Sequence, residues 1–230
     1  MQNILITGIS SGIGRALADA YLEEGYQVYG IGRTLPPSLD KHPHFVFFPY
    51  DLKETFLLRA TLKEFLQHKS FDLVILNAGV LGEIESLSQT HLSQMKDVME
   101  VNLWANKELI DTLAENAQVT QIVGISSGAS LHGSKGWGAY ALSKCALNML
   151  FRIYAQELPH IHFNTFAPGV IRTPMTEYIL NDVDEALYPS VKKLKNGPIQ
   201  TPQNAAKNLI VTFPKLLTYE NGSFVDIRQM

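Results

Sequence analysis

The sequence predicts an α/β protein built on a doubly wound parallel β-sheet with helices on both faces. Short apolar runs of strand length alternate along the chain with longer segments that have the apolar spacing of helices. Several apolar runs end in glycine or small polar residues, as strands do when their carboxyl ends form a binding site. The 230 residues, 46% of them hydrophobic, can bury a sizeable core. We therefore expect one domain that spans residues 1–230.

Four strands and two helices are predicted in the first part of the chain. The strands are short apolar runs at residues 3–7, 27–31, 45–48 and 71–76. The first helix, residues 15–24, ends before Gly25, and glycine is typical just past a helix C-terminus. The second helix, residues 53–67, follows Asp51, which is a suitable residue to cap its N-terminus.

The second part of the chain continues the alternation. The predicted helices cover residues 91–116, 139–158 and 201–213, and the predicted strands cover residues 121–125, 161–166 and 222–227. Pro159 marks the end of the middle helix, and Thr201 with Pro202 opens the last one. Residues 175–198 have no regular pattern, and their run of lysines indicates a solvated face.

Composition and charge exclude several classes of function. A net charge of −3 gives no basic surface for nucleic acid or an anionic membrane. The one cysteine, Cys145, allows no internal disulfide and no cysteine metal cluster, so we expect no metal site and a thiol packed inside a helix. The N-terminus lacks a basic leader and no apolar segment approaches the length of a membrane span. We expect a cytoplasmic protein.

A glycine-rich turn lies between the first predicted strand and the first predicted helix. Its glycines are Gly8, Gly12 and Gly14. Glycines permit unusual backbone angles and let a phosphate approach the amides at a helix N-terminus. A turn in this position indicates a dinucleotide site, although the spacing is not that of the G-x-G-x-x-G fingerprint.

The segment of residues 125–144 carries the groups needed for proton transfer. Tyr140 and Lys144 are four residues apart, so on a helix they share one face. A lysine beside a phenol favours the phenolate and brings the phenol pKa toward the working pH. Ser127 follows a predicted strand and can reach the same substrate oxygen. A Tyr-x-x-x-Lys pair alone is most often structural, and it is the serine thirteen residues upstream and the glycine-bearing loop that favour catalysis.

Together these motifs resemble the short-chain dehydrogenase/reductase family, in the family's order and over nearly the whole chain. The turn is similar to its T-G-x-x-x-G-x-G pattern, and Asn77-Ala78-Gly79 to its N-N-A-G, with Leu76 in place of the first asparagine. The resemblance implies a Rossmann-like fold. It also implies that the catalytic serine is Ser127 rather than Ser126, that Tyr140 is the general acid/base, that Lys144 is its partner, and that Asn102 is a fourth catalytic residue, which holds a water connected to the lysine.

The same resemblance implies a set of cofactor-binding residues. Asp51 and Leu52 would lie near the adenine, and the turn at Pro168 and Gly169 would meet the nicotinamide. The full set is Thr7, Gly8, Ser10, Ser11, Gly12, Ile13, Gly14, Arg33, Asp51, Leu52, Asn77, Ala78, Gly79, Tyr140, Lys144, Pro168, Gly169, Ile171 and Thr173.

The end of the second predicted strand favours NADP(H) over NAD(H). In dinucleotide folds a carboxylate at this place holds the adenosine ribose hydroxyls. Here the position is Gly32, and Arg33 follows it. An arginine pairs with a 2′-phosphate that an acid would repel. The alternative is a solvated arginine at a strand end. Arg15 either assists or only covers the surface.

The implied function is an NADP(H)-dependent oxidoreductase that reduces a ketone or aldehyde, or oxidises the alcohol, by hydride transfer. Residues 175–198 would cover this small-molecule substrate. His132, Trp137 and Met175 are the nearest candidates for substrate contacts. The alternatives are an NADP-binding regulator, or a partner-binding protein on the same fold, with vestigial catalysis.

The resemblance also implies a homodimer or homotetramer, formed through the two long helices that start near residues 91 and 140. No nucleic-acid or membrane partner is expected. The chain ends with Val225-Asp226-Ile227-Arg228, where the family commonly has a V-D-G-G-like signature. This departure puts the tetramer contacts in doubt more than the chemistry.

Overall fold

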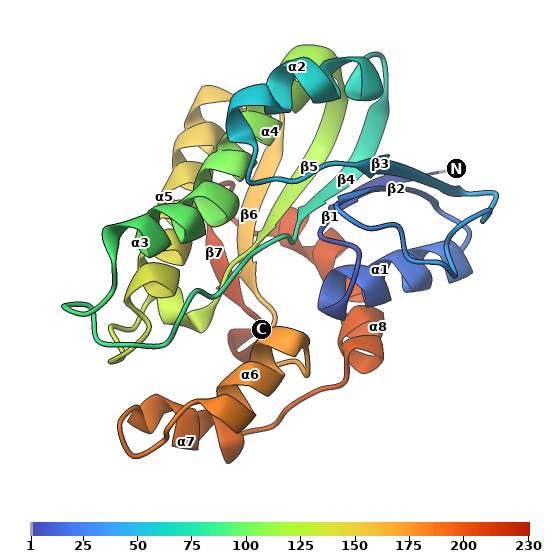
Figure 1. The fold of residues 1–230 in the computed structure, drawn as a ribbon. Helices are drawn as coiled ribbons and strands as arrows, with labels where there is room; N and C mark the ends of the chain where they lie inside the picture. The colour runs from blue at the N-terminus through green and yellow to red at the C-terminus, as the bar shows by residue number, and fades with distance from the viewer. Residues whose placement is uncertain (1) are drawn as a thin grey trace.

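The computed structural model describes residues 2–230, and their strands form one parallel sheet (Figure 1). The strands are β1 (Asn3–Thr7), β2 (Gln27–Gly32), β3 (Phe45–Pro49), β4 (Ser70–Leu76), β5 (Gln118–Ile125), β6 (His162–Ala167) and β7 (Phe224–Asp226). Their spatial order is β3-β2-β1-β4-β5-β6-β7. In register, Leu5 of β1 lies opposite Tyr29 on one side and Val74 on the other. The chain order reverses between β1 and β4, and such a switch point is where open α/β sheets bind ligands.

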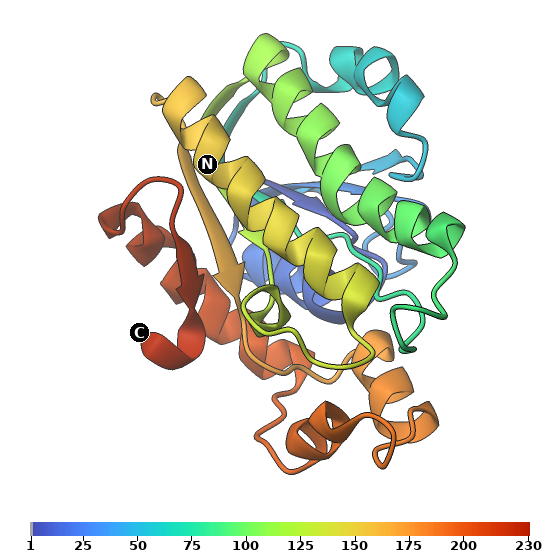
Figure 2. The ribbon, with the colours of Figure 1, turned by 90° about the vertical axis from the view of Figure 1, so that its left-hand side faces the viewer.

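Helices cover both faces of the sheet. They are α1 (Gly12–Glu23), α2 (Thr55–Leu66), α3 (Leu92–Met99), α4 (Ala105–Asn116), α5 (Gly138–Glu157), α6 (Pro174–Asp182), α7 (Pro189–Lys195) and α8 (Pro202–Thr212). One apolar core lies between the sheet and α2, α4 and α5, and a second lies between the sheet and α1 and α8. In Figure 2, α4 and α5 run side by side across one face of the molecule. The predicted doubly wound fold is confirmed.

The long helix predicted at residues 91–116 is interrupted by one wider turn. Between α3 and α4 the backbone forms a π-helical turn, Glu100–Trp104. Asn102 lies in this turn and is fully buried. Single π-helical turns inside helices often mark functional sites, because they redirect a side chain or a backbone group.

Two local predictions are wrong. Helix α2 begins at Thr55 instead of residue 53, because Asp51 first forms a turn in which its carbonyl accepts from the Glu54 amide at 3.0 Å. The Asp51 carboxylate accepts from the Lys53 amide at 3.0 Å and does not cap the helix. Cys145 is exposed rather than packed, because it lies on the outer side of α5.

The segment predicted to be irregular, residues 175–198, contains the two short helices α6 and α7. Each has a proline in its first turn, which suits a position without a hydrogen-bonded N–H. They pack in a third, separate apolar cluster with Trp137 and with the chain after β4. In Figure 1 they lie below the carboxyl ends of the strands.

No helix in the described part of the chain is long and apolar enough to cross a membrane.

Candidate functional site

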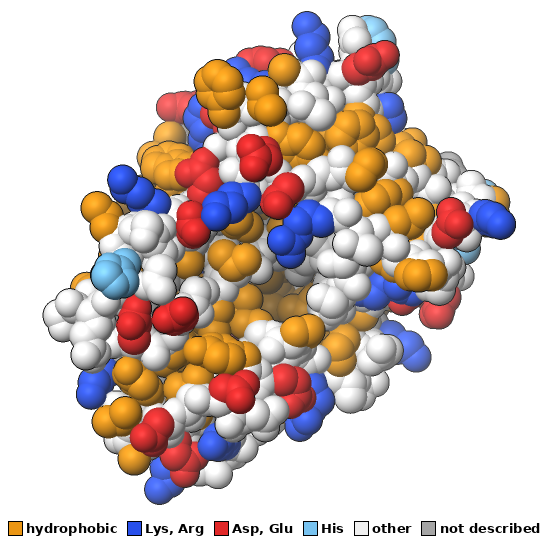
Figure 3. Space-filling model, viewed as in Figure 1, with side chains coloured by type: hydrophobic (Ala, Val, Ile, Leu, Met, Phe, Trp, Pro, Cys, Tyr) orange, Lys and Arg blue, Asp and Glu red, His pale blue; other side chains and the backbone are white. Residues whose placement is uncertain are grey.

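A large pocket of about 950 Å³ lies at the carboxyl ends of the central strands. Its walls come from the segments after β1, β2, β3, β4, β5 and β6, and from α5, α6 and α7. Figure 3 shows the hollow near the middle of this face, with hydrophobic side chains at its bottom. The predicted cofactor-binding and catalytic segments, far apart in sequence, therefore meet at one cavity.

The glycine turn fits a phosphate group. Gly8 and Gly12 have positive φ angles of 73° and 58°, which side chains rarely adopt. A Cβ on Gly14 would lie 2.3 Å from the Gly8 carbonyl oxygen and 2.4 Å from Asn77 Nδ2, so no other residue fits there. Ser11 precedes α1 without a side-chain cap, and the first turn carries no acid. The N-terminal amides of α1 are therefore open to an anion.

Thr7 and Asn77 join the ends of β1 and β4 behind this turn. Thr7 Oγ1 accepts hydrogen bonds from the amides of Asn77 and Ala78, both at 3.0 Å. Asn77 Nδ2 donates to the carbonyls of Thr7 at 2.9 Å and Gly8 at 3.2 Å. Thr7 and Gly14 do not line the pocket. They lie behind it and support the backbone of the glycine turn.

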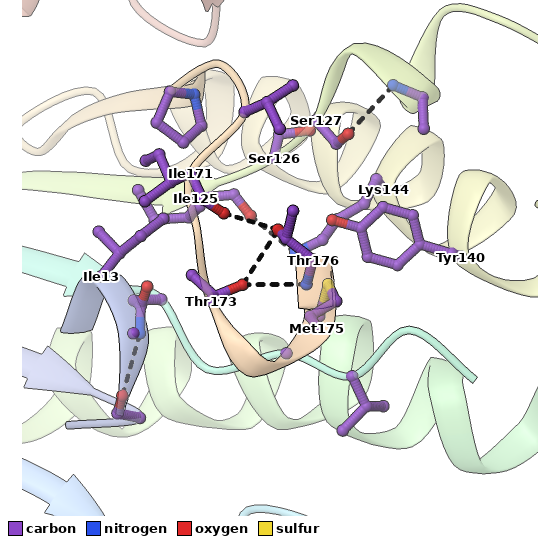
Figure 4. Close-up of a pocket in the computed structure, with 18 of the residues that line it drawn as sticks. Ile13, Ile125, Ser126, Ser127, Tyr140, Lys144, Ile171, Thr173, Met175 and Thr176 are labelled. Atoms are coloured by element: carbon purple, nitrogen blue, oxygen red, sulfur yellow. Dashed lines mark hydrogen bonds between the residues drawn. The ribbon is translucent and has the colours of Figure 1, made fainter. Parts of the chain in front are cut away.

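The two serines after β5 have different surroundings. Ser126 is buried, and its hydroxyl donates to Asn148 Oδ1 at 2.7 Å, a bond between structural elements. Both serines line the pocket, and the Ser127 Oγ accepts from the Ala129 amide at 3.1 Å. Figure 4 shows Ser127 beside Tyr140. The Ser126 hydroxyl is thus engaged with Asn148, which favours Ser127 for contact with a ligand, and the assignment of Ser127 as the catalytic serine stays a prediction.

Tyr140 and Lys144 lie on one face of α5 and line the pocket, as predicted from their spacing. Lys144 Nζ is 5.7 Å from the centre of the Tyr140 ring and donates to the Ile125 carbonyl at 2.7 Å. Burial raises the pKa of Tyr140 to about 12, which the Ser127 hydroxyl partly opposes. Burial lowers the pKa of Lys144 to about 8. The expected lowering of the phenol pKa is therefore absent here, because burial dominates and the ammonium group is directed at a carbonyl.

Asn102 does not line the pocket. Its amide group is occupied by Val80, whose N–H and C=O it binds at 2.8 Å, and by the Ser143 hydroxyl at 2.9 Å. A Cβ on Gly79 would lie 3.2 Å from Asn102 Oδ1 and 3.4 Å from Lys144 Nζ, so both side chains border the same small space. These contacts position the backbone at Val80 and the hydroxyl of Ser143 beside Lys144.

Most of the other predicted cofactor-binding residues border the same cavity. The pocket lining includes Gly8, Ser10, Ser11, Gly12, Ile13, Arg33, Asp51, Leu52, Asn77, Ala78, Gly79, Pro168, Gly169, Ile171 and Thr173. Arg33 is exposed at the end of β2. Arg15 pairs with Asp19 at 2.9 Å and is not part of the lining.

At the end of the pocket near Tyr140, the lining includes the three candidates His132, Trp137 and Met175. Trp137 Nε1 donates to Ser190 Oγ of α7 at 2.7 Å, which joins α7 to the start of α5. Sequence reasoning missed Ser190 because it found no helix there. It also missed Arg228, which the short last strand brings to the pocket, and the departure from the V-D-G-G ending was the signal for it.

Comparisons with known proteins agree on one family. The model of the short chain dehydrogenase family matches residues 2–184. The chain is 34% identical to an uncharacterized oxidoreductase of Schizosaccharomyces pombe, covering 97% of this chain and 95% of that protein. It is 34% identical to a benzil reductase ((S)-benzoin forming) of Saccharomyces cerevisiae, covering 81% and 76% of the two chains. A putative NAD(P)-dependent gluconate 5-dehydrogenase from Beutenbergia cavernae, with NADP bound, has a similar structure, with a TM-score of 0.82, 26% identity, and 98% and 94% coverage.

Proposed function

The chain belongs to the short-chain dehydrogenase family and is an oxidoreductase that acts on CH–OH or C=O groups, and we propose that it is an NADPH-dependent ketone reductase with Tyr140 as its proton donor. The observation that carries the proposal is that Ser127, Tyr140 and Lys144 line one pocket together with the glycine turn (Figure 4).

The residues at the pocket fit a nicotinamide dinucleotide. The positive-φ glycines and the uncapped N-terminus of α1 suit the pyrophosphate. A Cβ on Gly12 would lie 3.1 Å from Thr173 Cγ2, so the glycine turn and the loop after β6 approach each other closely. Arg33 would hold the 2′-phosphate, and Lys144 would hold ribose hydroxyls. The cofactor, when bound, supplies the hydride.

Protein groups handle the proton. Tyr140 gives its phenolic proton to the oxygen of the carbonyl as negative charge develops on it. Ser127 donates a hydrogen bond to the same oxygen. The positive charge of Lys144 stabilises the negative charge that is left on Tyr140. Asn102 acts indirectly, through the contacts that keep the backbone at Val80 and the hydroxyl of Ser143 in place beside Lys144.

For the substrate we propose aryl ketones and 1,2-diketones. One relative is a benzil reductase, and benzil is a 1,2-diketone with two phenyl groups. The end of the pocket near Tyr140 has an aromatic and apolar wall formed by Trp137, Met175 and Ile179, which suits a phenyl ring. The helices α6 and α7 of the segment 175–198 would cover the substrate.

The test of the catalytic assignment is Tyr140→Phe. We expect reduction of a 1,2-diketone by NADPH, and a fall in kcat of at least about 100-fold in the variant, because the proton donor is lost. NADPH binding by fluorescence titration should change little. An equal rate in the variant would contradict the proposal and favour a regulatory protein that only binds the cofactor.

The test of the cofactor preference is Arg33→Ala. We expect NADPH binding to weaken about 10- to 100-fold, with no change for NADH, because an arginine–phosphate pair is lost. Calorimetric titration with both cofactors measures this. Arg15→Ala is the matched control, since Arg15 pairs with Asp19 outside the pocket. Equal binding of NADPH and NADH by the unmodified protein would contradict the preference.

We also propose that residues 1–230 act as one domain and that the protein self-associates through α4 and α5. The exposed apolar residues on this face are Trp104, Leu142, Met149 and Ile153. The cytoplasmic location predicted from the sequence stays a prediction.

A further inference from the structure

Arg228 reaches the pocket from the last turn of the chain. The strand β7 ends at Asp226, and Arg228 follows it in a single 3₁₀ turn, Ile227–Gln229. A Cβ on Gly128 would lie 2.8 Å from Arg228 Nη2. Gly128 directly follows Ser127, so the guanidinium group lies against the loop that carries the catalytic hydroxyl.

A buried carboxylate fixes the guanidinium group in this position. Asp226 is only 4% exposed, while the Arg228 side chain is 62% exposed. Asp226 Oδ1 accepts from Arg228 Nε at 2.8 Å and from the Arg228 amide at 3.0 Å, and Asp226 Oδ2 accepts from Nη2. A planar fork held on one edge presents its other edge in a defined direction.

The pairing leaves donors available and cancels the charge. An arginine has five N–H donors, of which Asp226 takes two, so three remain. Since the carboxylate offsets the positive charge, the remaining donors suit an uncharged acceptor oxygen better than an anion. The pocket next to Ser127 therefore has hydrogen-bond donors that the transfer of one proton to one carbonyl does not require.

We propose that Arg228 is a specificity-determining residue that donates hydrogen bonds to a second, uncharged oxygen of the substrate, close to the reacting carbonyl. The inference rests on the proposed ketone reductase function and makes 1,2-diketones, rather than simple ketones, its preferred substrates. Donors that stay unpaired disfavour a substrate that lacks the second oxygen. Asp226 is then a positioning residue that acts through Arg228.

The experiment compares three ketones in steady-state kinetics with NADPH. They are 1-phenylpropane-1,2-dione, 1-phenylpropan-1-one and 1-phenylpropan-2-one, the last two each lacking one oxygen of the first. In Arg228→Met we expect kcat/KM for the dione to fall about 10- to 100-fold, because the second carbonyl oxygen is then left without a donor inside the pocket. The values for the monoketones should change less than about twofold. Comparing each variant with the unmodified enzyme removes the intrinsic reactivity of the dione.

Two further variants separate position from charge. Gly128→Ala keeps every charge, but its Cβ displaces the guanidinium group, and it should lose the same selectivity. Arg172→Met is the matched control, because Arg172 is also an exposed arginine paired with a carboxylate, Glu177, but does not line the pocket. NADPH affinity and the unfolding temperature of each variant report on folding.

Each outcome bears on one proposal. An equal fall for all three ketones, or no fall for the dione, in Arg228→Met would overturn the role of Arg228 while leaving the reductase intact. Preference of the unmodified enzyme for phenylglyoxylate over the dione would overturn the uncharged acceptor, since charge from groups such as Lys193 would then govern selection. Turnover of none of these compounds by the unmodified enzyme would contradict the proposed function and this inference with it.

Discussion

At the scale of single residues, the site combines a phenol that holds its proton and an amine that releases one readily. Burial moves their pKa values in these directions, Tyr140 up to about 12 and Lys144 down to about 8. Near neutral pH both groups therefore carry protons. This is the state that the proposed reduction requires, in which the phenol would give up its proton beside a cationic lysine.

The pKa of Lys144 predicts the pH dependence of the reaction. As the pH rises through about 8, Lys144 in the free enzyme loses its proton, and its charge no longer stabilises the phenolate. Tyr140 stays protonated up to about pH 12 and does not limit the rate. We expect kcat/KM for ketone reduction to fall above about pH 8.

Initial rates between pH 6 and 10 in buffers of constant ionic strength measure this profile. In Lys144→Arg the charge persists to higher pH, so the step near pH 8 should disappear from the residual activity. A profile of the unmodified enzyme that is flat up to pH 9.5 would show that the charge of Lys144 does not govern the reaction.

Sequence spacing could predict which residues meet at the site, because parallel strands bring their carboxyl ends to one edge. This rule and the helical repeat place Tyr140 and Lys144 on one helix face near the serines that follow β5, whereas the choice of Ser127 over Ser126 needed the family resemblance. The hydrogen bond from Lys144 to the Ile125 carbonyl could not be predicted, since it depends on side-chain direction within the packed core. The position of Arg228 depends on how the last strand joins the sheet.

At the scale of elements, a group of charged side chains joins α2, α4 and α5. Arg59 of α2 pairs with Glu108 at 2.8 Å, with Glu115 at 3.0 Å and with Asp111, all of α4. Asp111 also accepts from the hydroxyl of Tyr154 in α5. Asp111 is thus the one carboxylate of this network with partners on both neighbouring helices.

Replacing Asp111 by Asn is expected to lower the free energy of unfolding by about 1–2 kcal/mol, because charge-assisted hydrogen bonds are lost at a half-buried position. Chemical denaturation measures the change. The control is Glu115→Gln, an exposed partner of the same arginine, which should cost less than about 0.5 kcal/mol. Equal effects of both variants would show that the contact of Asp111 with α5 does not contribute to the free energy of unfolding.

The pKa of Asp111 gives this contribution a direction with pH. Burial alone would raise it, but hydrogen bonds from Lys107 and Tyr154 and the nearby cations outweigh burial and hold it below 3.8. The contribution is therefore present above about pH 4 and is lost as the pH falls through the lowered value.

Helices were predictable where an apolar repeat was long, and less so where it was short. The apolar face of α4 was sufficient to predict that helix, and the proline after α5 was sufficient to predict where α5 ends. Helices α6 and α7 are short, and their apolar residues face a small local cluster instead of the sheet. The π-helical turn at Glu100–Trp104 has no repeat of its own and could not be seen in the sequence.

At the scale of the whole molecule, the face formed by α4 and α5 exposes several large apolar side chains to solvent. Met149 of α5 is 53% exposed, Leu142 and Ile153 lie exposed on the same helix, and Trp104 lies exposed in the π-helical turn that precedes α4. Figure 2 shows this face toward the viewer. Such a face suits contact with a second copy of the chain through a two-fold axis.

We therefore expect a dimer or larger assembly that Met149→Glu weakens or dissociates, because a buried unpaired carboxylate is costly. Sedimentation velocity over a range of protein concentrations measures the change. The control is Phe56→Glu on α2, where a larger apolar side chain is 97% exposed on a different helix. A monomeric unmodified protein, or loss of assembly in the control as well, would refute the α4–α5 interface.

The strand order has a consequence for synthesis on the ribosome. The sheet grows outward from β1, first to β2 and β3 and then, on the other side, from β4 to β7. The ribosome delivers these strands in chain order, with the N-terminal part first. When β4 has emerged from the ribosome, the glycine turn and Arg33 have emerged as well. Tyr140 and the last strand emerge later. Cofactor added to a stalled chain would act as a folding template before any catalyst exists.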